Sequence, residues 1–380
     1  MPTGDGLLVR VKPPGGWLTS GAARSLAQAA QDCGNGIIEL TSRGNLQIRG
    51  LSAATVQPFA AAMVTVGLAS ADPSVEQRRN VMLLPLAGCD PAGAADAASL
   101  AAAVEAMLAA DPALAVLPPK FSFAVDGGGV LGLSEPADIT VRTDGIHHWI
   151  ELNGSQALCP PGATMAVLHD LARAAGPRRM REVGAVVAFA AVGLTPEPMA
   201  PRRATTPPVG FIAYPGTRQG AFGMGLPFGQ TDVATLCAMA DLADQFCDGT
   251  LRLSPWRVVL LGQVPAVLVS ALRDTVARAG LIADACDRRL HMAACIGSAG
   301  CASGTVRARD DAAALASAGW TGFLHVSGCA KGCAHPGDAR HTLVGEDGSY
   351  GLVRDGRASG VCLVTGLSVP QAAAQLGRHP

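Results

Sequence analysis

One pattern occurs twice in this chain, and it limits the fold more than any other feature of the sequence. Residues 6–10 favour a strand, residues 18–33 a helix, and residues 36–41 and 46–49 two further strands. A strand at 210–214, a glycine-rich turn, a helix at 232–246 and strands at 249–254 and 258–261 follow in the same order later in the chain. Each unit is too short to bury a core alone, so we expect the two to pack together.

The two units are separated by mixed α/β sequence and by a proline-rich stretch. Helical patterns cover 92–110, 165–175 and 265–279, and strand patterns cover 121–125 and 148–152. The apolar run 184–194 is too short to span a bilayer and predicts a buried strand. Prolines 196, 198, 201, 207 and 208 then disfavour helix and sheet pairing, which predicts a linker.

The overall composition excludes several classes of protein. Hydrophobic residues make up 49% of the 380 residues and the net charge is −1, which indicates a globular chain without a basic surface for nucleic acid. The N-terminus lacks the pattern of a signal peptide, and no apolar run is long enough for a membrane span. We therefore expect a cytoplasmic protein, in which clustered cysteines indicate metal binding rather than disulfides.

Four of the eleven cysteines form two close pairs. Cys295 and Cys301 are spaced C-x5-C, and Cys329 and Cys333 are spaced C-x3-C. Four thiolates suit a 4Fe–4S cluster, in which each iron takes one protein ligand, and the glycines around them let the backbone approach the sulfurs. A structural zinc site and four unliganded thiols are the alternatives, although zinc knuckles favour other spacings. The remaining cysteines are scattered and are expected to be small buried hydrophobes: Cys33, Cys89, Cys159, Cys237, Cys247, Cys286 and Cys362.

At these cysteines the chain resembles the sirohaem-dependent sulfite and nitrite reductases. Three basic segments are similar to motifs of that family: Thr41–Gln47, Arg79–Val81 and Leu117–Ser122. The resemblance implies an α+β fold in which two paired ferredoxin-like half-domains are each followed by an α/β lobe. The expected divisions are half-domain 1 at 1–72, lobe 1 at 73–195, the linker at 196–209, half-domain 2 at 210–270, and lobe 2 with the cluster at 271–380.

One departure directs the resemblance to a single branch. The family's third motif has two lysines two positions apart, whereas this chain has Lys120 and then Ser122. Residues 43–50, 79–91, 120–129 and 327–336 resemble the precorrin-3B synthase family instead. That resemblance implies an O2-dependent monooxygenase of aerobic cobalamin biosynthesis that hydroxylates precorrin-3A and forms a γ-lactone.

The resemblance also implies cofactors and partners. Besides the 4Fe–4S cluster it implies a mononuclear non-haem iron and an external electron donor, because no nicotinamide or flavin motif is visible. A sirohaem-dependent sulfite or nitrite reductase is the first alternative, in which Cys333 would also bridge to the sirohaem iron. A non-catalytic iron–sulfur protein that binds a tetrapyrrole is the second.

A tetrapyrrole polycarboxylate needs cationic partners, and arginine offers bidentate geometry. Arg43, Arg79 and Lys120 are the expected substrate-binding residues because they lie in the family motifs. Asn45 and Gln47 are added as amides on the same segment, with a local turn as the alternative role of Asn45. Weaker candidates are Arg10, Lys12, Arg49 and Arg78. His325, His335 and His341 follow no readable iron-binding spacing, and His147 and His148 are expected to be solvated.

Overall fold

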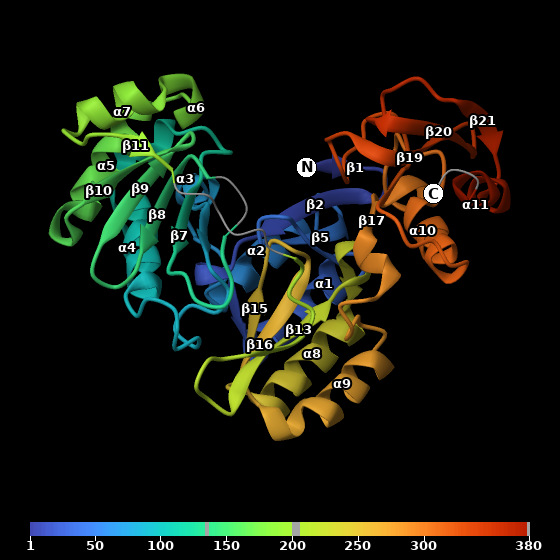
Figure 1. Cartoon of the computed structure of the whole chain (residues 1–380), viewed down its shortest axis with the longest axis horizontal. Helices are drawn as coiled ribbons and strands as arrows, with labels where there is room; N and C mark the ends of the chain where they lie inside the picture. Colours follow the sequence, from blue (N-terminus) through green and yellow to red (C-terminus); the bar gives the residue numbers. More distant parts are fainter. Residues whose placement is uncertain (134–136, 200–205, 378–380) are drawn as a thin grey trace.

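The computed structural model describes residues 1–133, 137–199 and 206–377, and it confirms the predicted α+β class (Figure 1). Two sheets of five strands lie at the centre of the molecule. The first has the order β1-β2-β5-β4-β14, and the second has the order β12-β13-β16-β15-β3. The strands of the first sheet are β1 (Pro2–Thr3), β2 (Gly6–Val11), β5 (Leu46–Leu51), β4 (Ile37–Leu40) and β14 (Gln230–Asp232). Those of the second are β12 (Gly210–Ala213), β13 (Gln219–Gly225), β16 (Val258–Pro265), β15 (Thr250–Leu253) and β3 (Trp17–Thr19).

The two sheets exchange one strand each. Strand β3, from the first repeat, pairs with β15 of the second sheet, and β14, from the second repeat, pairs with β4 of the first sheet. The exchange is symmetric, so each half-domain is completed by its partner. This arrangement explains why neither repeat could bury a core alone.

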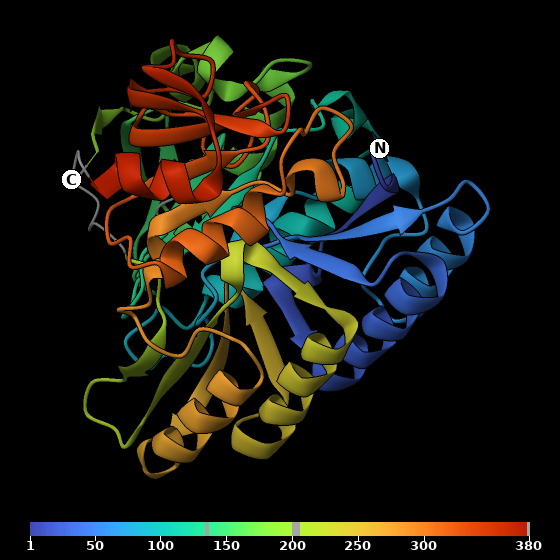
Figure 2. The ribbon, with the colours of Figure 1, turned by 90° about the vertical axis from the view of Figure 1, so that its right-hand side faces the viewer.

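The helices of the two half-domains cover the same side of the paired sheets. They are α1 (Ser20–Cys33), α2 (Val56–Thr65), α8 (Val233–Phe246) and α9 (Val269–Arg278). Helix α1 packs against α8, and Figure 2 shows them in blue and yellow beside the sheets. Leu26 and Ile38 of the first repeat and Phe222 and Leu251 of the second, all fully buried, belong to one continuous hydrophobic core.

Lobe 1 is built on a six-stranded sheet with the order β11-β10-β9-β8-β7-β6. Its strands are β6 (Val81–Leu83), β7 (Phe123–Asp126), β8 (Ile139–Thr143), β9 (His148–Leu152), β10 (Ser155–Cys159) and β11 (Glu197–Pro198). Its helices are α3 (Pro73–Arg78), α4 (Ala97–Ala110), α5 (Thr164–Ala175), α6 (Met180–Val183) and α7 (Ala185–Ala191).

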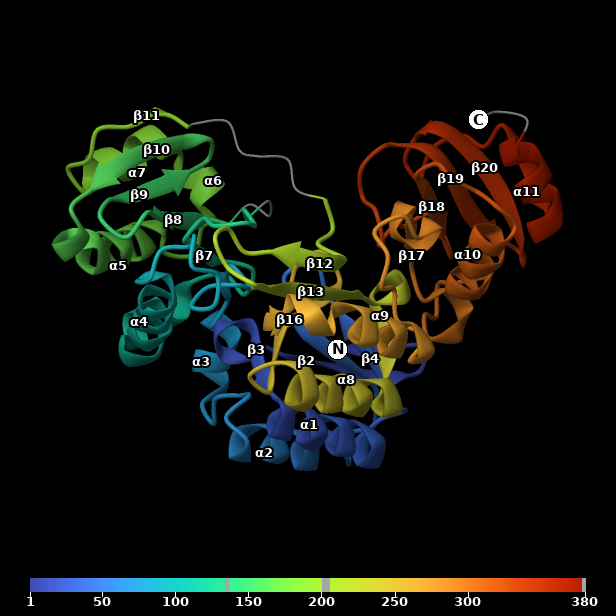
Figure 3. The same cartoon turned by 60° about the horizontal axis from the view of Figure 1, so that its bottom comes forward.

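Lobe 2 carries the four paired cysteines and has a sheet with the order β17-β18-β19-β20-β21. Its elements are β17 (Met292–Ala294), α10 (Ala308–Ser317), β18 (Leu324–Ser327), β19 (Ala339–Glu346), β20 (Ser349–Gly356), β21 (Val364–Leu367) and α11 (Val369–Gly377). Strands β17, β18 and β19 are parallel, and the remaining pairs are antiparallel. The two lobes stand on opposite sides of the half-domains (Figure 3).

The strand predicted at 184–194 is wrong, because residues 185–191 form helix α7. Ala188 and Phe189 point inward, whereas Val186 and Val187 are exposed. A short apolar run does not distinguish a strand from a helix by periodicity, and here the tertiary contacts decide. In the part of the chain that the structure describes, no helix is long and apolar enough to cross a bilayer.

The glycine-rich turn predicted after residue 214 is also wrong, because most of it forms the interior strand β13, which lies between β12 and β16. Two of its glycines are required by neighbouring backbone. A Cβ at Gly223 would lie 1.6 Å from the Pro208 carbonyl oxygen, and one at Gly220 would lie 2.2 Å from that of Ile212. The counterpart of β2 is therefore β13, and the predicted first strand, β12, corresponds to β1.

Part of the predicted linker pairs with lobe 1, since Glu197 and Pro198 form β11 against β10. Residues 200–205 lie outside the described residues. The domain boundaries at residues 72, 195, 209 and 270 stay predictions. In the folded protein, β3 of half-domain 1 lies in the sheet of half-domain 2, and β14 of half-domain 2 lies in the sheet of half-domain 1.

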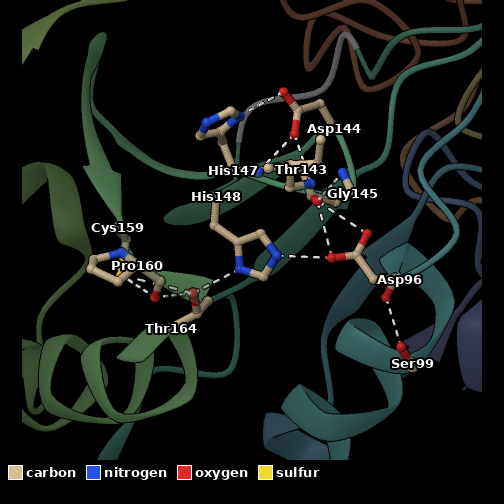
Figure 4. A network of polar contacts seen from close by, with 11 residues as sticks. Asp96, Ser99, Thr143, Asp144, Gly145, His147, His148, Cys159, Pro160 and Thr164 are labelled. Carbon is tan, nitrogen blue, oxygen red and sulfur yellow. Dashed lines mark hydrogen bonds and ion pairs between the residues drawn. The ribbon is translucent and has the colours of Figure 1, made fainter. Parts of the chain in front are cut away.

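His148 is not solvated as expected, because it lies at the centre of a buried polar network in lobe 1 (Figure 4). Its Nε2 is 2.8 Å from Asp96 Oδ2, and its Nδ1 is 2.7 Å from Thr164 Oγ1. Thr143 Oγ1 donates to the same carboxylate at 3.0 Å. The network joins β8, β9 and the first turns of α4 and α5. His147, in contrast, is exposed and contacts Asp144.

Candidate functional site

A cavity of about 690 Å³ lies where the two half-domains and the two lobes meet. Half-domain 1 contributes β2 and the β4–β5 loop, and half-domain 2 contributes residues 228–229 and Arg257. Lobe 1 contributes Lys120 from the segment before β7, and lobe 2 contributes Cys295, Cys333 and Arg309. A volume of this size is in the range of sites for cofactors and large ligands.

The cavity wall is rich in cations. Those that line it are Arg10, Arg43, Arg49, Lys120, Arg257 and Arg309. Among the residues that the structure describes, Glu39 is the sole acidic side chain in this lining. The excess of positive charge predicts an anionic ligand that carries several negative groups.

Three of these arginines are held by neighbours. Arg49 contacts Asp5 at 2.9 Å and donates to the carbonyl of Gly300 at 2.6 Å. Arg309 lies 2.6 Å from Glu39. The Gln47 amide accepts from Arg10 at 3.1 Å and donates to Glu39 at 3.2 Å. These contacts hold the three arginines in the wall and use part of their hydrogen-bonding capacity.

The other three cations have no such partner. Within residues 1–133, 137–199 and 206–377, the side chains of Arg43, Lys120 and Arg257 make no hydrogen bond or ion pair. Burial, followed by the charge of Arg309, lowers the pKa of Arg257, while Glu39 opposes this effect. These three side chains are therefore free to bind anionic groups in the cavity.

The four paired cysteines line a second cavity, of about 440 Å³, between lobe 2 and the N-terminal residues 2–4 and Arg49 of half-domain 1. The two cavities share Arg49, Cys295, Ile296 and Cys333 in their walls. Cys295 follows β17, Cys301 follows the 3-10 turn 297–299, and Cys329 and Cys333 follow β18. The ends of two parallel strands thus bring the C-x5-C and C-x3-C pairs together.

The backbone around the cysteines is closely packed through glycines. A Cβ at Gly297 would lie 2.1 Å from the Val306 carbonyl oxygen, and one at Gly304 would lie 2.4 Å from Gly297 C. A Cβ at Gly328 would approach the Cys295 sulfur to 3.3 Å, and the Gly328 N–H donates to this sulfur at 3.1 Å. Such N–H donors stabilise the thiolates of an iron–sulfur cluster.

The donor set fits a 4Fe–4S cluster better than a single ion. Burial raises the pKa of the Cys333 thiol, and the nearby charges of Cys295, Cys329 and Cys301 raise it further. No three His, Cys, Asp or Glu side chains in the described chain are close enough to bind one metal ion. In a cubane each thiolate binds a different iron, so its ligands need not meet around one ion. A structural zinc site, in contrast, requires its four ligands to surround one ion.

The histidines of lobe 2 do not assemble a site for mononuclear iron. His325 is fully buried, neither ring nitrogen has a hydrogen-bond partner in the described structure, and burial lowers its pKa to about 4. The His335 ring lies 5.7 Å from it between centroids, with Nε2 3.1 Å from the Asp338 carbonyl oxygen. His341 stacks edge-on against Trp320. Because no three His, Cys, Asp or Glu side chains gather around one point anywhere in the described residues, these residues do not fit such an iron.

The structure places Arg43, Lys120 and Gln47 in the lining of the large cavity. Asn45 does not line it, and its backbone closes the β4–β5 loop through hydrogen bonds with Thr41. Arg79 also lies outside the lining. Its guanidinium contacts Glu76 at 2.9 Å and the carbonyl of Leu68 at 3.2 Å.

Among the charged and aromatic residues of the wall, four were not predicted from the sequence: Glu39, Phe228, Arg257 and Arg309. Of the weaker candidates, Arg10 and Arg49 line the cavity, whereas Lys12 donates to the carbonyl of Glu76 and Arg78 to that of Leu108. Only the strand exchange and the position of lobe 2 bring the missed residues together.

Comparisons with known proteins agree with this architecture. The family model described as the nitrite/sulfite reductase ferredoxin-like half domain matches residues 1–66 and 216–279. The solved structure of the NirA protein of Mycobacterium tuberculosis aligns with a TM-score of 0.72, covering 98% of this chain and 79% of that chain at 18% identity. This likeness shows the fold.

Two curated relatives differ in how much of the chain they match. A precorrin-3B synthase of Sinorhizobium sp is 34% identical over 95% of this chain and 82% of its own length. A ferredoxin–nitrite reductase of Leptolyngbya laminosa is 31% identical, but over 32% of this chain and 24% of its own length. The first similarity extends through both lobes, whereas the second is confined to a part of the chain.

Proposed function

Because the chain belongs to the precorrin-3B synthase family, we propose that it is an oxidoreductase that converts precorrin-3A to precorrin-3B in aerobic cobalamin biosynthesis. One oxygen atom of O2 enters a meso carbon of the macrocycle, the ring-A acetate closes a γ-lactone, and the second oxygen atom leaves as water. The balance requires two electrons and two protons, which we assign to an external electron donor and to solvent.

The observation that carries this proposal is the cationic cavity beside the four cysteines. Arg43, Lys120 and Arg257 present unpaired positive charge to it, and Cys295 and Cys333 belong to the walls of both cavities. A polycarboxylate tetrapyrrole supplies the complementary charge. The bound macrocycle would then lie against the cysteine-lined wall.

We propose that Cys295, Cys301, Cys329 and Cys333 hold a 4Fe–4S cluster, which supplies single electrons when bound. The chain's own residues orient the substrate. Arg43 and Lys120 bind its carboxylates from two sides, Gln47 lies beside them, and the Glu39 contacts keep Arg309 and Arg49 in place. Fixing the macrocycle in this way positions its acetate for ring closure. Arg79 and Asn45, which the motifs predicted as substrate-binding residues, lie outside the lining, and we propose that they support the wall without contacting the substrate.

A sirohaem-dependent sulfite or nitrite reductase is the alternative that the fold allows. Ser122, in the place of the family's second lysine, argues against it. This residue is almost fully buried, and its backbone N–H donates to Asp138 at 3.0 Å rather than facing the cavity. Of the two positions that carry lysines in the reductases, the first, Lys120, lines the cavity, whereas the second, Ser122, does not.

The decisive experiment incubates anaerobically purified protein with precorrin-3A, a reductant and O2. The hydroxylactone product, detected by mass spectrometry with 18O2 as the label source, supports the proposal. An intact cluster without this product contradicts it. The visible spectrum distinguishes the sirohaem-dependent reductase from the synthase, because bound sirohaem gives strong Soret and near-red bands.

We further propose a cytoplasmic location, with which eleven cysteines that form no disulfide are consistent.

A further inference from the structure

The two half-domains are related residue by residue through their strand pairing. Glu39 pairs with Gln47 across β4 and β5, and Arg252 pairs with Leu260 across β15 and β16. In each repeat the last pair of this ladder, Leu40 with Leu46 and Leu253 with Val259, closes a loop of the same length. Position for position, residues 41–45 therefore correspond to residues 254–258.

At the fourth position of these loops the backbone is left-handed in both repeats. Gly44 has φ of 65°, and Arg257 has φ of 59°. Glycine adopts this conformation without steric cost, whereas a long side chain is strained by it. The second repeat thus keeps a strained residue at a position where the first repeat has the residue that the geometry prefers.

A second position breaks the symmetry in the same way, and its compensation is visible. The 3-10 turns Pro14–Gly16 and Pro227–Gly229 precede the exchanged strands, and their central residues are Gly15 with φ of 62° and Phe228 with φ of 54°. Phe228 is buried and belongs to the hydrophobic core of lobe 2. Packing against lobe 2 therefore offsets the strain at Phe228.

Arg257, unlike Phe228, is not packed into a hydrophobic core in the described chain. Its backbone carbonyl accepts a hydrogen bond from the Leu226 N–H at 3.0 Å, but its side chain makes no hydrogen bond or ion pair, and its half-buried guanidinium lines the large cavity. The aliphatic part of the Arg257 side chain packs against Gly229, where a Cβ would lie 2.7 Å from Arg257 Cδ. Strained backbone conformations cluster at active sites and ligand clamps, where the surrounding structure holds them in place. A desolvated cation without a partner likewise needs an anion.

Resting on the proposed function, we propose that Arg257 is a substrate-binding residue that holds a carboxylate of the tetrapyrrole. Its loop abuts the β4–β5 loop, because a Cβ at Gly44 would meet the Leu253 carbonyl oxygen at 3.6 Å. Arg43 and Arg257 therefore reach the cavity from adjacent loops of the two repeats. The pair forms a two-armed clamp for separate carboxylates of one macrocycle, with bidentate geometry at each arm.

The test measures the affinity of the cluster-loaded full chain for uroporphyrin III, a tetrapyrrole with an acetate and a propionate on every ring, by absorbance titration. Arg257→Gly restores the residue of the first repeat, so the fold is expected to tolerate it, while affinity falls roughly tenfold to a hundredfold. Arg257→Lys keeps the charge without the planar fork and is expected to bind between the two. The matched control is Gln263→Gly, an exposed left-handed residue outside the cavity lining, which should leave affinity unchanged.

The outcomes separate this inference from the proposed function. Native-like affinity of Arg257→Gly overturns the inference and leaves the proposed function intact. Failure of the native chain to bind the probe overturns both. Loss of binding in Arg257→Gly, restored in part by Arg257→Lys, supports the inference even if the native protein gives no hydroxylactone from precorrin-3A.

Discussion

Glu39 Oε1 and Arg309 Nη1 lie 2.6 Å apart and join the sheet of half-domain 1 to the helix α10 of the lobe that carries the cysteines. Arg309 also donates to the Gln230 side chain on the exchanged strand β14, which pairs with Glu39 in the ladder. One ion pair thus ties together three elements from different parts of the chain. A second contact, the hydrogen bond that Arg49 donates to the carbonyl of Gly300 between the first two cysteines, also joins half-domain 1 to lobe 2.

The first prediction concerns the charge of this junction. Glu39→Gln removes the carboxylate from an otherwise cationic lining, so affinity for uroporphyrin III should rise about threefold to tenfold at low ionic strength and less at high salt. The unfolding free energy should fall by about 1–3 kcal/mol, because Arg49 and Arg309 lose their buried partner. Titrations at two salt concentrations and denaturant unfolding measure both effects. An affinity that is unchanged at low salt would contradict the electrostatic reading of the cavity.

The second prediction concerns the cysteines. Replacing any one of Cys295, Cys301, Cys329 or Cys333 by serine should lower the iron and acid-labile sulfide content of anaerobically purified protein by more than half, because a cubane lacks one of its four ligands. Cys286→Ser is the matched control, since this exposed thiol lies outside both cavities and its loss should leave the content unchanged. Equal cluster content in all variants would refute the assignment of ligands.

The third prediction separates two arginines that the sequence motifs treat alike. Arg43→Gln should weaken uroporphyrin III binding about tenfold with little effect on stability, because its side chain lines the cavity without an internal partner. Arg79→Gln should leave binding unchanged within a factor of two, but should lower the unfolding free energy by about 1–3 kcal/mol, because Glu76 and the Leu68 carbonyl lose their donor. Each variant is the control for the other, and equal losses of binding in both would contradict the structure.

The fourth prediction follows from the buried imidazole of His325. Its pKa in the folded protein is about 4, below the ordinary value of 6.5. Between these pH values the unfolded chain binds a proton that the folded chain excludes, so the unfolding free energy decreases as the pH falls from 6.5 to 4. The decrease from this group alone should reach about 2–3 kcal/mol, and His325→Leu should remove it.

Denaturant unfolding at several pH values measures the slope, with cluster absorbance recorded at each pH. His291→Leu is the control, because His291 is an exposed histidine of the same lobe and its replacement removes an imidazole without opening a buried site. A slope that persists in His325→Leu would assign the acid sensitivity to another group.

The fifth prediction concerns the polar network of lobe 1. His148→Ala should lower the unfolding free energy by about 2–3 kcal/mol, because it leaves Asp96 and Thr164 without their shared partner. Cluster content and the affinity for uroporphyrin III should stay at native levels, since the network lies outside both cavities. Loss of binding without loss of stability would instead assign His148 a role in the site.

Short-range patterns in the sequence determined much of this protein. The helices at 20–33 and 233–246 and the strands at 37–40 and 46–51 follow from periodicity, and the cysteine spacings identified the four side chains that line one cavity. These features depend on residues that are near one another in the chain. The same local reasoning failed for 184–194, where a short apolar run is compatible with either a helix or a strand.

Tertiary structure alone decided the composition of the large cavity. Arg43 and Arg79 both lie in basic motifs, yet the fold turns one to the cavity and binds the other to Glu76. Glu39, Arg257 and Arg309 come from separate elements and meet because each half-domain takes a strand from its partner. The strand pairing of the folded protein is also what reveals that the left-handed residue Arg257 corresponds to Gly44 of the first repeat. Contacts between residues so far apart in sequence depend on the packing of whole elements, which no local pattern of side chains specifies.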